Sequence, residues 1–149
     1  MATYTDSLGF NKGTAAFTSD VSSVSKIEVV LDFAQIVAAR AAAGATALAA
    51  ADVLQVLQIP AGAVVLTAGL QVLTTDASTA TFDLGFTGGS PAAANVYAND
   101  AAIGTAGFSI AALANPTAVN AADTLDLLIN TAAPTTGKIR VFAVVADVN

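Results

Sequence analysis

Residues 52–85 read DVLQVLQIPAGAVVLTAGLQVLTTDASTATFDLG, and this stretch decides the fold class. It holds three segments rich in Val, Leu and Thr, separated by Pro-Ala-Gly at 60–62 and by Asp-Ala-Ser at 76–78. Pro cannot donate to a strand ladder, and Gly, Asp and Ser favour turns. The stretch therefore predicts three consecutive β-strands, at 53–59, 63–74 and 79–84. Gly69, in the middle of the second, predicts a bulge or bend.

The same alternation of apolar and polar residues recurs on both sides of this stretch. It predicts further strands at 26–33, 106–112, 124–130 and 138–145, which makes seven strands, or eight if part of the N-terminus also pairs. The alternation assigns the following residues to the core: Ile27, Val29, Leu31, Phe33, Leu66, Leu70, Val72, Phe82, Leu84, Leu125, Leu127, Ile129, Ile139, Val141 and Val145.

The segments between these strands are expected to be irregular, with one exception. Residues 34–51, AQIVAARAAAGATALAAA, have strong helix propensity interrupted by Gly44, which predicts a short helix over about 34–43 and then a loop. Residues 85–104 and 115–123 contain the turn-forming residues Gly, Pro and Asn and are expected to be loops or turns. The glycines at 85, 88 and 89 do not have the spacing of a phosphate loop.

The chain is expected to divide into an N-terminal arm at 1–24, where no period persists, and a β-sandwich domain at 25–149. The fold class is all-β: an antiparallel β-sandwich, jelly-roll-like, with one short Ala-rich helix and the arm.

The charge and the hydropathy pattern of the chain argue against nucleic-acid and membrane partners and indicate a protein partner. Charged residues make up 11% of the 149 residues, and the net charge is −6, whereas a typical soluble domain has about 25% charged residues. An acidic surface repels phosphate backbones, so no nucleic-acid partner is expected. Apolar stretches fall short of the ~20 residues that a spanning helix needs, and no signal peptide is visible, so no membrane partner is expected. A surface so poor in charge indicates contact with another protein chain.

Catalytic chemistry is scarce in this sequence. It has no His, no Cys and no Trp, which excludes thiolate chemistry and the usual zinc sites. A Ser–Lys pair would have to use Lys12, Lys26 or Lys138, the three lysines of the chain. We therefore expect no enzyme, no catalytic or cofactor-binding residues and no cofactor.

Two acidic groupings remain as candidate sites, and a simpler interpretation exists for each. Asp83, Asp123 and Asp126 are candidates for the carboxylate pair of a glycosidase, but each lies where a strand or turn exposes an acid to solvent. Asn95, Asn99 and Asp100 offer oxygens for calcium, but without the spacing of a calcium loop. No metal site is expected.

Several segments resemble small structural proteins of the heads of tailed bacteriophages. They are LDFA at 31–34, IPA at 59–61, VLTAGLQV at 65–72, TATFDLG at 79–85 and the terminal GKIRVFAVVADV at 137–148. The resemblance covers about residues 27–89 and the last dozen. The loop GFTGGSP at 85–91 differs from the acidic D-G-x-D-P version of that family, which puts a ligand or ion at 85–104 in doubt.

The resemblance implies a capsid decoration (cement) protein with a jelly-roll-like fold. Such a protein binds the outer surface of the capsid and stabilises the major capsid protein, its partner, often as a homotrimer. It is made in the host cytoplasm and located in the virion, on the capsid surface. Two alternatives stay open: another minor virion protein, such as a head fibre or tail component, and a carbohydrate- or cell-surface-binding β-sandwich.

The expected interface consists of apolar side chains that the alternation turns outward, together with two aromatic residues of the arm. It comprises Phe10, Phe17, Val30, Leu128, Phe142 and Val144. Either the arm docks Phe10 and Phe17 onto a neighbouring copy or the capsid, or it packs along its own sandwich as an extra edge strand.

Overall fold

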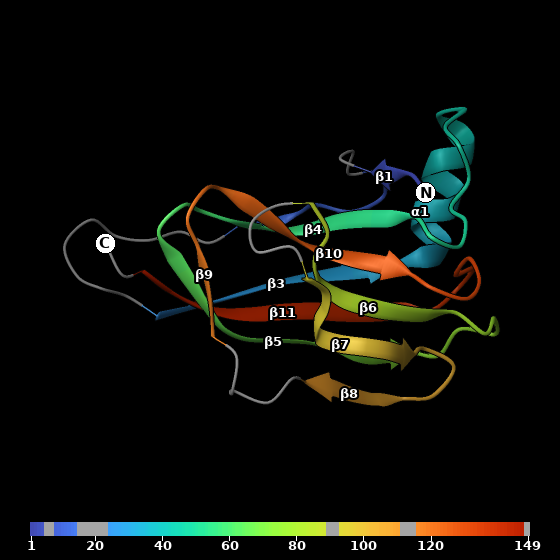
Figure 1. The fold of residues 1–149 in the computed structure, drawn as a ribbon. Helices are drawn as coiled ribbons and strands as arrows, with labels where there is room; N and C mark the ends of the chain where they lie inside the picture. The colour runs from blue at the N-terminus through green and yellow to red at the C-terminus, as the bar shows by residue number, and fades with distance from the viewer. Residues whose placement is uncertain (5–7, 15–23, 89–92, 111–115, 148–149) are drawn as a thin grey trace.

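The computed structural model describes residues 1–4, 8–14, 24–88, 93–110 and 116–147, which form two stacked β-sheets and one helix (Figure 1). The all-β sandwich expected from the sequence is confirmed. The elements are β1 (Thr3–Tyr4), β2 (Gly13–Thr14), β3 (Val24–Asp32), α1 (Phe33–Ala42), β4 (Val53–Ile59), β5 (Ala63–Thr74), β6 (Thr81–Phe86), β7 (Ala93–Ala102), β8 (Gly107–Ile110), β9 (Thr117–Val119), β10 (Asp123–Ile129) and β11 (Lys138–Asp147).

The strands are divided between two sheets, which we call sheet A and sheet B. Sheet A has the order β1-β4-β10-β6-β7, with β2 also pairing with β4. Sheet B has the order β3-β11-β5-β8, with β9 also pairing with β5. All pairs are antiparallel except those of β1 and β2 with β4, which are parallel. Strands far apart in sequence thus lie side by side, as they do in a jelly roll.

The core lies between the two sheets and contains every residue assigned to it from the sequence except Leu66. Two aromatic pairs fill it. Phe33 stacks on Phe82 with ring centroids 5.5 Å apart, and Phe86 meets Tyr97 edge to face at 6.3 Å. The Tyr97 hydroxyl donates to the Val65 carbonyl at 3.4 Å, which joins β7 of sheet A to β5 of sheet B.

Strand β5 is bulged against β11 at two places, Leu66 and Leu73, so the prediction of a bulge at Gly69 is wrong. Strand β11 pairs with Val65 and with Thr67 through consecutive residues and skips Leu66. One extra residue reverses the alternation at that point, because side chains change face at every position of a strand. Leu66 is therefore half-buried and Val65 is buried, while Gly69 pairs regularly with Phe142.

The expected short helix is confirmed as α1, which lies across one end of the sandwich (Figure 1). Asp32 caps its N-terminus by accepting a hydrogen bond from the Gln35 amide at 3.3 Å. Phe33, expected as the last strand residue, is the first helical residue and is fully buried. Ile36 and Arg40 are also buried, so the helix covers the open end of the core.

Two segments expected to be loops or turns contain strands. Residues 93–102 form β7, an edge strand that pairs with β6, and residues 117–119 form β9. The sequence of β7 is rich in Ala and Asn, which have low strand propensity. Its pairing with β6 also shifts register twice, so no regular alternation marks it as a strand.

The described residues of the N-terminal arm pack on their own sandwich, as the second alternative expects. Strands β1 and β2 pair with β4, and Tyr4 and Phe10 are buried. The Asp52 carboxylate accepts hydrogen bonds from the Ala2 amide at 3.0 Å and from the Tyr4 hydroxyl at 2.8 Å. The guanidinium of Arg40 lies 4.0 Å from the centre of the Tyr4 ring.

Two glycines allow the arm to approach this closely. Gly9 has a φ of +85°, and a Cβ there would lie 2.6 Å from the Cα of Ile36 in α1. A Cβ on Gly13 would lie 2.4 Å from Cδ2 of Leu57 and 2.9 Å from the carbonyl oxygen of Glu28. Since Leu57 belongs to β4 and Glu28 to β3, the arm passes between an edge of each sheet and closes that side of the sandwich.

Candidate assembly interface

The outer surface of sheet B is the candidate interface, and we call it the B face. Inward residues of β3, β11 and β5 are buried, and the residues between them point away from sheet A. Cross-strand pairing aligns the outward residues in rows. They are Val24, Lys26, Glu28, Val30 and Asp32 of β3; Lys138, Arg140, Phe142, Val144 and Ala146 of β11; and Val64, Thr67, Gly69 and Gln71 of β5.

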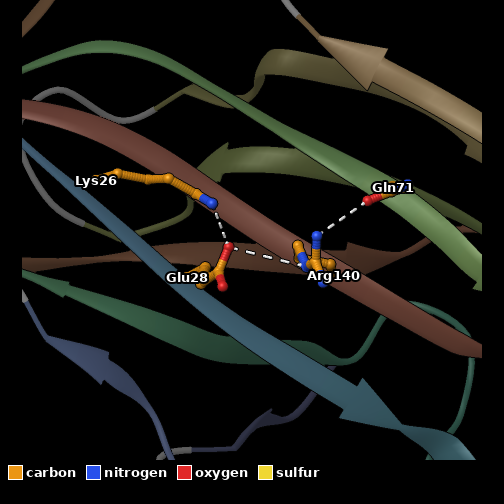
Figure 2. A network of polar contacts seen from close by, with 4 residues as sticks. All are labelled: Lys26, Glu28, Gln71 and Arg140. Atoms are coloured by element: carbon orange, nitrogen blue, oxygen red, sulfur yellow. Dashed lines mark hydrogen bonds and ion pairs between the residues drawn. The ribbon is translucent and has the colours of Figure 1, made fainter.

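A charged network crosses the B face over three adjacent strands (Figure 2). The Lys26 ammonium lies 2.6 Å from a carboxylate oxygen of Glu28, and the same oxygen lies 3.8 Å from Nε of Arg140. Arg140 also donates from Nη1 to the Gln71 side-chain oxygen at 3.4 Å. The contacts of Arg140 are long: among the described residues its Nε is buried without a hydrogen-bond partner, and its side chain as a whole is 38% exposed.

These ion pairs keep the acids of the B face ionised. The hydrogen bond from Lys26 lowers the pKa of Glu28 below its ordinary value. The Lys138 ammonium, 2.9 Å from Asp32, lowers the pKa of that carboxyl in the same way. Because these groups are exposed, the pairs organise the surface and add little to folding stability.

Apolar side chains lie among the charged ones on the same face. Val24 is 65% exposed and Val30 42% exposed. Phe142 and Val144 are half-buried. Phe142 pairs across the strands with Gly69, which has no side chain to compete for the space beside it. The B face is therefore a mixed surface, in which Arg140 lies between Val30 and Gln71 across the strands and between Lys138 and Phe142 along β11.

The outer surface of sheet A, which we call the A face, has a different character. Its central strands are β10 and β6, with outward residues Thr124, Asp126, Leu128, Thr81 and Asp83. Beside them, the Asn130 amide donates to Asp83 at 2.7 Å and to Asp100 at 3.0 Å. The Asp100 backbone amide also donates to Asp83 at 2.7 Å. The acids of this cluster are satisfied by polar donors and not by cations.

Asp126 is the most deeply buried acid of the A face, at 2% exposure. It accepts hydrogen bonds from the backbone amide and the hydroxyl of Thr87, and from the hydroxyl of Thr124 at 2.7 Å. Burial raises the pKa of Asp126 despite these donors. The bonds tie β10 to the residue that follows β6.

The structure brings together three of the interface residues expected from the sequence. Val30, Phe142 and Val144 all lie on the B face. Leu128 is half-buried on the A face, so it belongs to a different surface.

The two arm residues of the expected interface do not join that group. Phe10 is buried in the core of its own chain. Phe17 lies outside the described residues.

The charged half of the B face was not predicted from the sequence. Alternation in 26–33 already points Lys26 and Glu28 outward, but nothing in the sequence aligns β3 with β11. The register that sets Val30 opposite Arg140 comes from pairing over more than a hundred residues of chain, and only the folded sheet defines it.

The two acidic groupings considered for catalysis or metal binding lie on β6, β7 and β10, which are neighbouring strands of sheet A. No group of three or more His, Cys, Asp or Glu residues that could hold a metal ion is found in the part of the chain that the structure describes. Asn95, Asn99 and Asp100 lie on β7, where the Asn95 amide donates to Asn99 at 3.3 Å and Asp100 binds Asn130. Across the described ranges, no helix has the length and hydrophobicity of a membrane span.

Three hollows of the described surface lie outside the B face, and the smallest of these, of about 180 Å³, is lined mostly by apolar residues of β5 and β7 and by the segment before β8. The first, of about 480 Å³, is lined by Gln55, Gln58, Ile59, Pro60, Ala122, Asp123 and Thr124. The second, of about 220 Å³, lies between α1 and the turn before β11 and is lined mostly by small apolar side chains. The first has one acid, Asp123, in its lining, and the second has none.

Comparison of the sequence with known proteins gives no match, either to a protein-family model or to a curated protein. Comparison of the fold does. The structure is similar to a chain in the capsid asymmetric unit of cyanophage Pam1, with a TM-score of 0.59 and 23% identity, covering 89% of this chain and 90% of that chain.

Two further capsid structures contain a similar chain. In the capsid of Ralstonia phage GP4 the TM-score is 0.59 at 15% identity, over 99% of this chain and 97% of that chain. In the acid-stable capsid of Helicobacter pylori bacteriophage KHP30 it is 0.54 at 15% identity, over 85% and 88%. The resemblance to phage virion structural proteins is thus confirmed at the level of the fold.

Proposed function

We propose that this protein is a structural component of a bacteriophage virion that decorates the head. It binds the outer surface of the capsid as a cement protein and stabilises the major capsid subunits. The observation that carries the proposal is the fold match to chains of phage capsids. The match extends over nearly the whole of both chains compared, so the matched chains are about as long as this one.

The surface chemistry supports a role in assembly and not in catalysis. The chain has no His or Cys, and its buried acids are engaged in structural hydrogen bonds. The partners that we propose are the major capsid protein and further copies of the same chain, arranged as a homotrimer. The protein then acts in the virion, without a cofactor, nucleic acid or membrane.

The carbohydrate-binding alternative receives less support. Sugar-binding β-sandwiches present aromatic rings on an exposed face. Among the aromatic side chains that the structure describes, Phe142 is half-buried and the others are buried in the core. A head-fibre or tail role shares the same chemistry as decoration, so position in the particle separates these two.

The experiment uses heads of the parent phage assembled without this protein. Purified protein is added back, its position is determined by cryo-electron microscopy, and the temperature at which the heads break is measured with and without it. We expect density on the outer capsid surface and heads that resist higher temperatures. Density confined to a tail or fibre, or an unchanged breaking temperature with no binding, would overturn the decoration role.

A further inference from the structure

We propose that the B face is the surface that binds the capsid shell and that the A face points away from it, toward solvent. This inference rests on the proposed decoration function and adds the orientation of the molecule to it. The occupant of the B face is a shell surface that is largely apolar and presents a carboxylate to Arg140.

The first support is the uneven distribution of charge. Lys26, Lys138 and Arg140, three of the five cations, lie on the B face together with only two acids, Glu28 and Asp32. Among the described residues the face therefore carries +1, and the remainder, with two cations and seven acids, carries −5. A nearly neutral face is the easier one to take out of water, whereas an acidic one is favoured in contact with it.

The second support is the composition of the B face. Strong protein–protein contacts place arginine and aromatic residues at the centre of the interface, surrounded by apolar side chains. Arg140 and Phe142 are two positions apart on the central strand β11, with the exposed Val30 and Val24 on β3. The Arg140 side chain is 38% exposed, and the terminal amino groups of a guanidinium match a carboxylate in both geometry and charge.

The A face of a second copy is the obvious competitor as occupant, since it is acidic. Its carboxylates, however, are already engaged: Asp83 and Asp100 by Asn130, and Asp126 by Thr87 and Thr124. Asp83 and Asp126 are also buried, at 8% and 2% exposure. These buried carboxylates cannot easily reach an arginine of another chain. The capsid shell is therefore a better occupant of the B face than a second copy of this protein.

The experiment compares B-face variants with a matched control on the other sheet. Val30→Glu changes the charge of an exposed position on the B face, and Arg140→Glu that of a half-buried one. Asn99→Glu adds one negative charge to an exposed position of β7 in sheet A, as Val30→Glu does in sheet B. Dissociation constants are measured on heads that lack the protein, after circular dichroism and thermal unfolding confirm that each variant is folded.

We expect both B-face variants to bind at least tenfold more weakly, and Asn99→Glu to bind within about twofold of the wild type. If the wild type binds and the B-face variants bind equally well, the orientation is wrong while the decoration role stands. If the wild type does not bind heads at all, the decoration role itself fails. If Arg140→Glu abolishes self-association and leaves shell binding intact, the occupant is a second copy, and the inference is overturned.

Discussion

Asp76 is an acid at 4% exposure whose carboxylate holds two turns together. It accepts hydrogen bonds from the backbone amides of Thr135, Thr136 and Gly137 at 2.8, 2.8 and 2.7 Å, and from that of Ser78 at 2.7 Å. Backbone donors on this scale favour the ionised form, so the pKa of Asp76 is held well below its ordinary value. The turn after β5 and the turn before β11 depend on that charge.

We therefore predict that Asp76→Ala lowers the free energy of unfolding by about 2–4 kcal/mol, because it leaves buried amides without an acceptor. Asp76→Asn keeps the shape and one acceptor oxygen, so its loss is smaller. Because the pKa is lowered on folding, the stabilisation by Asp76 is complete above the unfolded value of about 3.8 and is lost as the pH falls below it. Urea unfolding from pH 7 to pH 2 should show the gap between wild type and Asp76→Asn closing below about pH 4.

Asp126 presents the opposite case, since burial raises its pKa. Its ionised form is costly at neutral pH, and this cost disappears as the pH falls below the unfolded value of 3.8. Asn fits the same place: its oxygen accepts from the Thr87 amide, and its NH₂ group donates to the Thr124 hydroxyl, which rotates to accept.

We predict that Asp126→Asn is as stable as the wild type or more stable at pH 7, by on the order of 1 kcal/mol, a rise of about 2–4 °C in Tm. The advantage should vanish at pH 3, where the wild-type carboxyl is protonated. Thermal unfolding at the two pH values checks it. A variant that is clearly less stable at pH 7 would mean that the charge of Asp126 stabilises the fold.

At the scale of elements, the described part of the arm belongs to the sandwich, and a glycine of the arm can be compared with a glycine outside it. Gly9 and Gly44 both have positive φ, +85° and +64°. An added Cβ at Gly9 collides with the backbone of Ile36, whereas at Gly44 it meets nothing within 4 Å. Substitution at Gly44 therefore measures backbone strain alone, and substitution at Gly9 measures strain together with the packing of the arm on α1.

We predict that Gly44→Ala costs about 1 kcal/mol and that Gly9→Ala costs about 3 kcal/mol or more. Chemical denaturation of both variants gives the two values directly. Equal losses would show that the arm does not pack tightly on the helix. That result would favour the alternative in which the arm docks onto a neighbouring copy or the capsid.

The elements also show what the sequence could predict and what it could not. Strands 53–59 and 63–74 agree with β4 and β5, because alternation and the Pro60–Gly62 turn are local signals. The bulge at Leu66 and the strand β7 were missed, since each depends on the register of a partner strand. The same reason applies to the B face. Val30, Phe142 and Val144 were predicted as outward residues, but their position on one face with Arg140 depends on the strand pairing of sheet B.

At the scale of the whole molecule, one chain forms a complete core. Its accessible surface of 6788 Å² is close to the value of about 6,900 Å² expected for a compact monomer of this mass. The amount of exposed surface therefore does not require a partner for folding. The composition of the surface indicates a partner instead. The surface is poor in charge, and its charges are divided between a nearly neutral B face and an acidic remainder.

Folding of one chain and association of several chains can be separated by dilution. If the proposed trimer joins chains that are already folded, the protein should sediment as a trimer at micromolar concentration and dissociate into folded monomers on dilution. An obligate trimer would lose its structure at the same dilution, because its core would be shared between chains. Sedimentation equilibrium combined with circular dichroism over a thousandfold range of concentration separates these cases. A monomer throughout that range would contradict the trimer in solution. Copies would then come together only on the capsid, where the shell sets the spacing between them.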